Sequence, residues 1–354
     1  MMKKIILHGA TNCGSSNFGD FLYGVAVYNY IKENYKDIEV GFYNPSEYFI
    51  KYIGDCKISL SKSDMLIYIP GGYFGQSHKS RFIDNAIQFV RFMPVGIKAI
   101  FKSIKIGVIG IGAGPIISPF LKYPIKMIGN KAEMISTRDN ESYNALKSLG
   151  LDNILELSDL ILALNIHNLS DTTDQVVDIC KKCEGRKLLF VHYNHSLLAR
   201  DIFARQLDTF VEENPEYQLV VGSDCLLSYD DEYYIEFSKR VKKNCIQFNY
   251  DSPFELIALL ERVDAVLTCK LHVGVVATML NKPVVCFAEH PEKTKRYYRQ
   301  INQPDRCVSL YDTSEEEMLS ILKDKIFEKS FVPDEEIDKA KRNFDVLNEL
   351  INKK

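Results

Sequence analysis

The segment with the clearest potential for chemistry is Lys270-Leu271-His272, which follows a short apolar run and precedes a mostly apolar helix. The first turn of a helix disfavours cations, so a lysine and a histidine placed there suggest an anion between them. Histidine also exchanges protons near neutral pH. The structural alternative is that Lys270 packs its aliphatic stem and extends its amine to water, while His272 is a core histidine whose ring nitrogens are hydrogen-bonded. We favour the functional interpretation because ligands of open parallel sheets bind at the carboxyl ends of strands.

Two other cations also follow predicted strands. Lys293 lies in the charged segment 289–296 and would add positive charge to the same rim, although much of that segment is also typical of a solvated turn. Arg138 follows an apolar strand, where a guanidinium can bind a phosphate or carboxylate through two hydrogen bonds. Its structural alternative is an ion pair with a neighbouring acid at a helix start.

Loops rich in glycine and small polar residues follow three of the predicted strands, at 9–20, 70–76 and 110–115. Such loops allow the backbone to approach a ligand closely. The first lacks the Gly-Lys-Ser/Thr ending of a Walker loop, and the third lacks the last glycine of a dinucleotide-binding motif, so we exclude both of those sites. The loop residues that we consider as ligand neighbours are Asn17, Gly19, Gly71, Gly72, Gly112 and Gly114.

Each of these loops also has a structural explanation. Gly71-Gly72 is equally compatible with a tight exit from a strand. Asp20 lies at a helix start, where an acid caps the helix and complements its dipole, and spacing alone favours capping. His192 and His195 follow a strand, but a metal would need a third ligand that the sequence does not show, so we favour a polar cleft wall; Cys180 and Cys183 are typical of a surface helix. We therefore predict no metal site.

Short apolar runs alternate with longer amphipathic segments, which predicts parallel sheets joined by crossover helices. The predicted strands are 5–9, 38–43, 65–70, 105–111, 134–137, 153–157, 187–192, 218–221, 245–248, 265–268, 284–287 and 307–310. The predicted helices are 21–33, 81–101, 116–129, 142–149, 196–214, 231–243, 253–261, 273–280, 294–300 and 334–352.

Length and composition limit the class of protein. The 354 residues predict two domains, which we place at 1–168 and 169–330, joined through a polar linker at 165–174 and followed by a C-terminal helix at 331–354. The net charge of −3 does not indicate nucleic acid as a partner.

The apolar runs are too short or too often interrupted to span a bilayer, and nine cysteines without framework spacing predict a cytoplasmic protein with reduced thiols. The face of the helix at 82–101 fits either a peripheral membrane contact or an ordinary amphipathic helix, and we favour the latter.

In order and spacing, these loops together resemble the polysaccharide pyruvyl transferase family over nearly the whole chain. The motifs that carry the resemblance are Asn17-Phe-Gly19-Asp20, Gly71-Gly72, Gly110-Ile-Gly-Ala-Gly-Pro115, Thr137-Arg138-Asp139 with Ser142, Asp159, Lys270-Leu-His272 with Gly274 and Ala277, Lys282-Pro283-Val284 and Lys293. One position departs from the family, which usually has arginine where this chain has Lys270.

The resemblance implies a fold of two Rossmann-like doubly wound domains facing a cleft, as in GT-B glycosyltransferases. It implies transfer of a pyruvyl group from phosphoenolpyruvate to a sugar of a polysaccharide or its precursor, forming a ketal on two hydroxyls. We expect the N-terminal domain to hold the acceptor, either free or lipid-linked, and the C-terminal domain to hold the donor.

The donor's phosphate and carboxylate require cations, for which Lys270, Lys293 and Arg138 are the candidates. His272 is the candidate general acid and Asp20 the candidate base, and no step requires a cofactor or a metal. Two alternatives remain open: a GT-B glycosyltransferase that uses a nucleotide-sugar, and a non-catalytic binding protein on the same fold. The sequence leaves the oligomeric state open.

Overall fold

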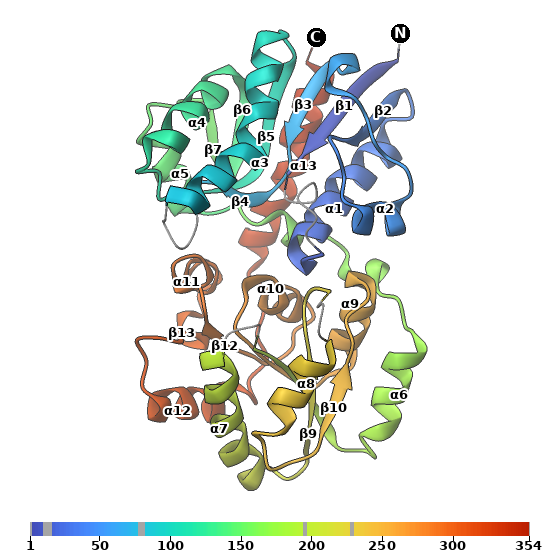
Figure 1. Cartoon of the computed structure of the whole chain (residues 1–354), viewed down its shortest axis with the longest axis vertical. Coiled ribbons are helices and arrows are strands. Elements are labelled where there is room, and N and C mark those ends of the chain that lie inside the picture. The colour runs from blue at the N-terminus through green and yellow to red at the C-terminus, as the bar shows by residue number, and fades with distance from the viewer. Residues whose placement is uncertain (1, 10–15, 77–81, 194–196, 227–229, 354) are drawn as a thin grey trace. The chain divides into compact units, whose positions relative to one another are not determined.

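The structure, a computed structural model, describes residues 2–9, 16–76, 82–193, 197–226 and 230–353. The chain forms two compact units (Figure 1). Unit 1 comprises Met1–Leu164 together with Asp334–Lys354, and unit 2 comprises Asn165–Pro333. Each unit contains a parallel sheet with its own buried core.

The sheet of unit 1 has the strand order β2-β1-β3-β5-β6-β7, and β4 pairs with β5 beside this path. Its strands are β1 (Lys3–His8), β2 (Ile38–Phe42), β3 (Met65–Tyr68), β4 (Gly71–Phe74), β5 (Lys105–Ala113), β6 (Ala132–Thr137) and β7 (Ile154–Glu156). The strand order reverses between β1 and β3, which is where open sheets of this kind bind ligands. The predicted turn at Gly71-Gly72 is in fact the start of the short strand β4.

The helices of unit 1 are α1 (Phe18–Asn34), α2 (Glu47–Ile53), α3 (Phe82–Phe101), α4 (Pro119–Lys131), α5 (Asn140–Lys147) and α13 (Asp334–Asn352). Several start at side chains that bind the free backbone N–H groups of the first turn, including Asn17 for α1, Ser46 for α2 and Asp139 for α5. These caps fix where the helices start after β1, β2 and β6.

The C-terminal helix α13 returns to unit 1 and packs against β5, β6 and the 3-10 helix η3 (Leu160–Ala163) (Figure 1). Its buried face carries Leu347 and Leu350, and Gly107 in β5 gives Leu350 room, since a Cβ there would lie 2.5 Å from its Cδ1. The last twenty residues therefore complete the core of the first unit.

The sheet of unit 2 has the strand order β10-β9-β8-β11-β12-β13. Its strands are β8 (Lys187–His192), β9 (Tyr217–Gly222), β10 (Cys245–Phe248), β11 (Ala265–Thr268), β12 (Val284–Ala288) and β13 (Cys307–Ser309). Numbered from the first strand of the unit, this is the order 3-2-1-4-5-6 of the dinucleotide-binding fold. The order reverses between β8 and β11.

The helices of unit 2 are α6 (Asp174–Lys182), α7 (Leu197–Glu213), α8 (Asp230–Ser238), α9 (Pro253–Arg262), α10 (Leu271–Met279), α11 (Pro291–Gln300) and α12 (Glu315–Lys325). Val284–Ala288 in β12 is buried at every residue, as expected for an inner strand covered on both faces. The predicted fold class, two Rossmann-like α/β domains, is confirmed. No helix in the described part of the chain is long and apolar enough to cross a membrane.

Candidate functional site

Unit 2 places three polar side chains at the point where its strand order reverses. His192 ends β8, Thr268 ends β11, and Lys270 caps the start of α10 two residues later. The first two pair directly across the strands, since His192 and Thr268 are register partners in the sheet. Lys270 therefore lies where this fold binds its ligands.

Asp224, two residues after β9, connects these groups. Its Oδ1 accepts a hydrogen bond from Lys270 Nζ at 2.8 Å and lies 3.4 Å from His192 Nε2. The other ring nitrogen, His192 Nδ1, is hydrogen-bonded to Thr268 Oγ1 at 2.9 Å. His192 and Asp224 are almost completely buried, so the carboxylate has been removed from water, and Lys270 and His192 both help to compensate for that loss.

The buried pair fixes the charges of both members. Burial alone would raise the pKa of Asp224, but Lys270 and His192 outweigh it and hold that pKa well below its usual range. Burial alone would lower the pKa of Lys270, but the Asp224 carboxylate raises it. Lys270 is therefore a permanent cation held in one place, which suits a group that binds an anion.

Lys270 retains capacity to bind a ligand. Its side chain is 21% exposed, and Asp224 uses only one of the three N–H donors of the ammonium. Among the residues described, its side chain makes no other hydrogen bond. The remaining donors and the partial exposure allow Lys270 to bind a phosphate or carboxylate from outside.

The start of α11 adds a second cation to this edge. His290 caps the helix, and Lys293 follows in its first turn. Burial lowers the pKa of His290, and the positive charges of Lys293 and Lys270 lower it further, against the opposing effect of Glu289 and Glu292. Lys270 follows β11 and Lys293 follows the neighbouring strand β12, so the two predicted donor-binding lysines lie at one edge of the sheet.

His272 is the second residue of α10 and is half-buried. It lies in the first turn of the helix that Lys270 caps, next to the end of β11. The sequence placed it at this edge, and the structure agrees.

In unit 1, Arg138 follows β6 and lies in a buried cluster. Its Nη1 lies 3.4 Å from the hydroxyl of Tyr23 in α1, and that hydroxyl donates a 2.5 Å hydrogen bond to Asp159. Nε of Arg138 lies 3.6 Å from Asp139, which also caps α5. The ion pair with Asp139 was the structural alternative for this residue, and it is present.

Burial and the opposing charges determine protonation in this cluster. Burial raises the pKa of Asp159, although Arg138 and the Tyr23 hydroxyl counteract that rise. Burial alone would lower the pKa of Arg138, but Tyr23, Asp139 and Asp159 raise it. The guanidinium is therefore permanently charged.

Two glycine positions lie next to this arginine. A Cβ at Gly112 would lie 2.8 Å from the guanidinium carbon, and one at Gly72 would lie 3.5 Å from Nη2. Gly114 lies just past the end of β5 with a φ of +81°, and a Cβ there would meet Ala145 rather than Arg138. Gly71 begins β4, which pairs with Gly112's strand. The loops that the sequence singled out thus make room for Arg138, and Nη2 faces the exposed backbone of Gly72.

The start of α1 also belongs to this edge of unit 1. Asn17 caps the helix, and its side chain accepts a 3.3 Å hydrogen bond from the backbone N–H of Asp20. Gly19 is buried in the first turn, and the side chain of Asp20 is half-buried. Asn17, rather than Asp20, is the capping residue. Asp20 complements the helix dipole in the first turn.

The sequence interpretation missed Asp224 and Tyr23. The position of Asp224, just after an apolar strand, was the available signal, but its partner Lys270 is 46 residues away and only the fold joins them. Tyr23 lies within an apolar stretch, where a tyrosine gives no sign of an acidic partner. His195 falls outside the described residues, and within them no group of three or more His, Cys, Asp or Glu could hold a metal ion.

Comparisons with known proteins point to one family. A family model described as polysaccharide pyruvyl transferase matches residues 17–291. No curated protein matches the chain. Among solved structures, UDP-GlcNAc 2-epimerase of Methanocaldococcus jannaschii is 11% identical with a TM-score of 0.67, covering 98% of this chain and 99% of its own.

Other similar structures have the same architecture. MnaA of S. aureus with UDP is 13% identical with a TM-score of 0.63, covering 99% of this chain and 97% of its own. HepE of Anabaena with UDP and glucose is 12% identical with a TM-score of 0.54, covering 98% and 97%. At these identities the likeness supports the fold.

Proposed function

Because the chain belongs to the polysaccharide pyruvyl transferase family, we propose that it transfers a pyruvyl group from phosphoenolpyruvate to a sugar of a polysaccharide or its precursor. The observation that supports the proposal is the cation Lys270, which is paired with Asp224 at the carboxyl edge of unit 2, the same edge at which Lys293 lies.

Phosphoenolpyruvate carries a phosphate and a carboxylate, and it therefore needs more than one cation. Lys270 and Lys293 lie at one edge and are the groups that would hold it. The helix starts of α10 and α11 add partial positive charge from their free N–H groups. Arg138 in unit 1 is a further candidate for an anion through Nη2.

The transfer requires a proton at carbon and two new carbon–oxygen bonds. In the proposed reaction, His272 gives a proton to the methylene carbon of phosphoenolpyruvate while a sugar hydroxyl attacks the central carbon. The carbon–oxygen bond to phosphate then breaks, and a second hydroxyl closes the ketal. Of the two hydroxyl protons, one restores His272 and the other leaves with inorganic phosphate, so the products are the ketal and phosphate.

Asp20 is the candidate base that first accepts the second of these hydroxyl protons, before that proton leaves with inorganic phosphate. Its half-buried carboxylate at the ligand-binding edge of unit 1 supports this role. It lies in the first turn of α1, where the positive end of the helix dipole favours a negative charge.

A nucleotide-sugar is the alternative donor. The specific observation in its favour is the likeness in fold to enzymes whose structures contain UDP, such as MnaA of S. aureus. The pyrophosphate group of a nucleotide-sugar could bind to the same two lysines and to the N-termini of α10 and α11.

The experiment is to incubate the protein with phosphoenolpyruvate and a panel of sugar acceptors and to follow phosphate release. We expect release only when both substrates are present. His272→Ala should reduce turnover by about 100-fold or more, because general acid catalysis contributes that much.

Lys270 provides a matched pair of variants for donor binding. Lys270→Arg keeps the charge and the pair with Asp224 and should retain or improve donor affinity, whereas Lys270→Met should raise the KM for phosphoenolpyruvate at least tenfold. Full turnover by His272→Ala would exclude its role as the acid. If no acceptor in the panel leads to phosphate release from phosphoenolpyruvate, and a sugar is transferred from a nucleotide-sugar instead, the alternative donor is supported.

A further inference from the structure

Helices α3 and α4 of unit 1 expose an unusual amount of apolar surface. Along α3 the exposed positions 83, 87, 90, 98 and 101 recur at helical spacing, so they form one stripe. Along α4 the exposed apolar side chains are at 120, 123 and 127. The exposed large apolar residues from 82 to 127 are Phe82, Ile83, Ile87, Val90, Phe101, Ile117, Phe120, Tyr123 and Met127, ranging from 38% exposed for Met127 to 83% for Phe101.

The two helices present these side chains as one surface. They lie side by side in the same unit (Figure 1). The ring of Phe120 lies 5.6 Å from that of Phe82 and 5.5 Å from that of Phe89, so aromatic side chains bridge the helices. We call this surface, residues 82–101 and 117–131, the α3–α4 face. A continuous exposed apolar surface of this kind marks a contact with a membrane or another protein.

The charge of this region differs from that of the chain. Residues 82–131 contain seven lysines and arginines and one acid, Asp84, whereas the whole chain has a net charge of −3. Within the described part of the chain, none of the exposed cations of the two helices forms an ion pair with a carboxylate. These cations are Arg91, Lys98, Lys102, Lys122, Lys126 and Lys131. Exposed lysines elsewhere, such as Lys242 and Lys341, do have acidic partners.

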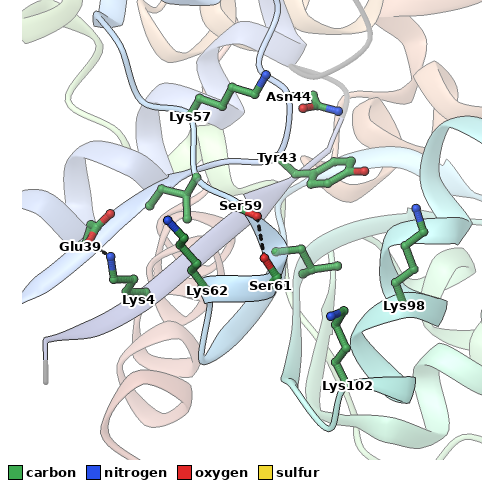
Figure 2. Close-up of a pocket in the computed structure, with 12 residues that line it drawn as sticks. Lys4, Glu39, Tyr43, Asn44, Lys57, Ser59, Ser61, Lys62, Lys98 and Lys102 are labelled. Atoms are coloured by element: carbon green, nitrogen blue, oxygen red, sulfur yellow. Dashed lines mark hydrogen bonds and ion pairs between the residues drawn. The ribbon is translucent and has the colours of Figure 1, made fainter.

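A pocket at the end of α3 extends this positive charge. It has a volume of about 550 Å³ and lies between α3 and the segment 57–62. Lys98 and Lys102 line it from α3, and Lys57 and Lys62 line it from the opposite side (Figure 2). The only acid in the lining, Glu39, is paired with Lys4. Four lysines without carboxylate partners in the described structure therefore surround a space large enough for a phosphate group.

We propose that the α3–α4 face docks on an anionic lipid surface, with its apolar side chains in the interface and its lysines against the lipid phosphates. Apolar side chains beside unpaired cations are the pattern of interfacial helices. Each cation near an anionic leaflet adds to the attraction, and the lysine pocket places further cations at one end of the face. A protein partner would require complementary acids, whereas a bilayer supplies both the apolar layer and the negative charge.

The experiment is co-sedimentation of the full chain with lipid vesicles. One set contains phosphatidylcholine alone, and the other contains roughly one third phosphatidylglycerol. We expect binding to the anionic vesicles, little binding to the neutral ones, and weaker binding as salt rises and screens the charges.

Two pairs of substitutions separate the contributions of charge and apolar contact. Lys98→Gln with Lys102→Gln should lower vesicle affinity by roughly 30-fold. Phe82→Ser with Phe120→Ser should lower it by on the order of tenfold or more. All four side chains are exposed, and thermal unfolding verifies that the variants remain folded.

The matched controls lie in unit 2, where Lys181 and Lys182 on α6 are exposed and Phe327 and Phe331 are exposed apolar residues. Lys181→Gln with Lys182→Gln, and Phe327→Ser with Phe331→Ser, should leave vesicle affinity unchanged. Failure of the wild-type chain to bind anionic vesicles would overturn the proposal, as would equal losses in the controls. Light scattering can show a dimer that the Phe82 and Phe120 substitutions dissociate. If the wild-type chain forms such a dimer and does not bind vesicles, the face is instead the contact with a second copy of the chain.

Discussion

The proposed donor-binding site depends on Asp224. Its carboxylate is buried, and it holds the Lys270 ammonium at 2.8 Å while facing His192. The sequence could predict Lys270 and His272 because both follow an apolar strand in a place where cations are unusual. It could not predict Asp224, since the pairing depends on β9 and β11 lying on either side of β8.

We predict that Asp224→Asn weakens both stability and donor binding. The amide cannot neutralise Lys270, so the free energy of unfolding should fall by about 2 kcal/mol, and the KM for phosphoenolpyruvate should rise because the lysine loses its fixed position. Urea unfolding and phosphate release measure the two effects. As a control, Asp178→Asn removes an exposed acid of α6 and should change neither. An unchanged KM for Asp224→Asn would contradict the positioning role.

His8 gives a prediction about pH. It ends β1, is 1% exposed among the rings of Tyr43, Tyr68 and Phe92, and its ring nitrogens make no hydrogen bond within the described structure. Burial lowers its pKa to about 4, against the smaller opposing effect of the backbone of Phe92 and Arg91. Below the ordinary pKa of 6.5, the unfolded chain binds a proton that the folded chain does not.

The contribution of His8 to stability is therefore complete above pH 6.5 and is lost as pH falls toward 4. The total loss should be about 3 kcal/mol. His8→Phe keeps an aromatic ring in the cluster and should remove this part of the pH dependence, which urea unfolding at a series of pH values measures. This assignment would be contradicted if the free energy of unfolding changed with pH in the same way for the wild-type chain and for His8→Phe.

At the scale of elements, strands were predictable because each is a short apolar run, and β8, β10 and β11 have the predicted bounds. The start of β4 was interpreted as a turn because its two glycines have no apolar side chains, although pairing with β5 makes it a strand. The helix at 334–352 was predicted from its apolar spacing. The sheet against which this helix packs was not predictable, because apolar residues on one face of a helix do not specify which sheet covers that face.

Asn343 connects α13 to the sheet of unit 1. It is fully buried, its Nδ2 donates to the backbone oxygen of Ser158 at 3.0 Å, and its Oδ1 accepts from Ser136 Oγ at 2.7 Å. Ser136 in turn accepts from the backbone N–H of Gly110 in β5 at 2.7 Å. Asn343 therefore bonds one loop and strand β6 directly, and reaches β5 through Ser136.

We predict that Asn343→Ala lowers the free energy of unfolding by about 3 kcal/mol, because buried polar groups are left without partners. The exposed neighbour Lys341 pairs only with Asp338 one turn away, so Lys341→Ala should cost less than about 0.5 kcal/mol. Denaturant unfolding of both variants gives the comparison. Equal stabilities would show that α13 is held by its apolar contacts alone.

At the scale of the whole molecule, length predicted two domains, the alternation of apolar runs with amphipathic segments predicted the α/β class, and the order and spacing of motifs predicted the family. The net charge of −3 gave no sign of the positive α3–α4 face, because an average over the chain conceals a local excess. The sequence also favoured an ordinary amphipathic helix at 82–101. The exposure of its apolar stripe became visible only once α3 and α4 were seen to leave it uncovered.

The central claim is that phosphoenolpyruvate is the donor and binds through Lys270. The most direct test is thermal unfolding of the wild-type chain with phosphoenolpyruvate or with nucleotide-sugars, in parallel with Lys270→Met. Ligand at about 100 times its Kd should stabilise the folded chain by about 2.7 kcal/mol. We predict that phosphoenolpyruvate raises the Tm of the wild-type chain and does not raise the Tm of Lys270→Met. A rise with nucleotide-sugars and none with phosphoenolpyruvate would contradict it.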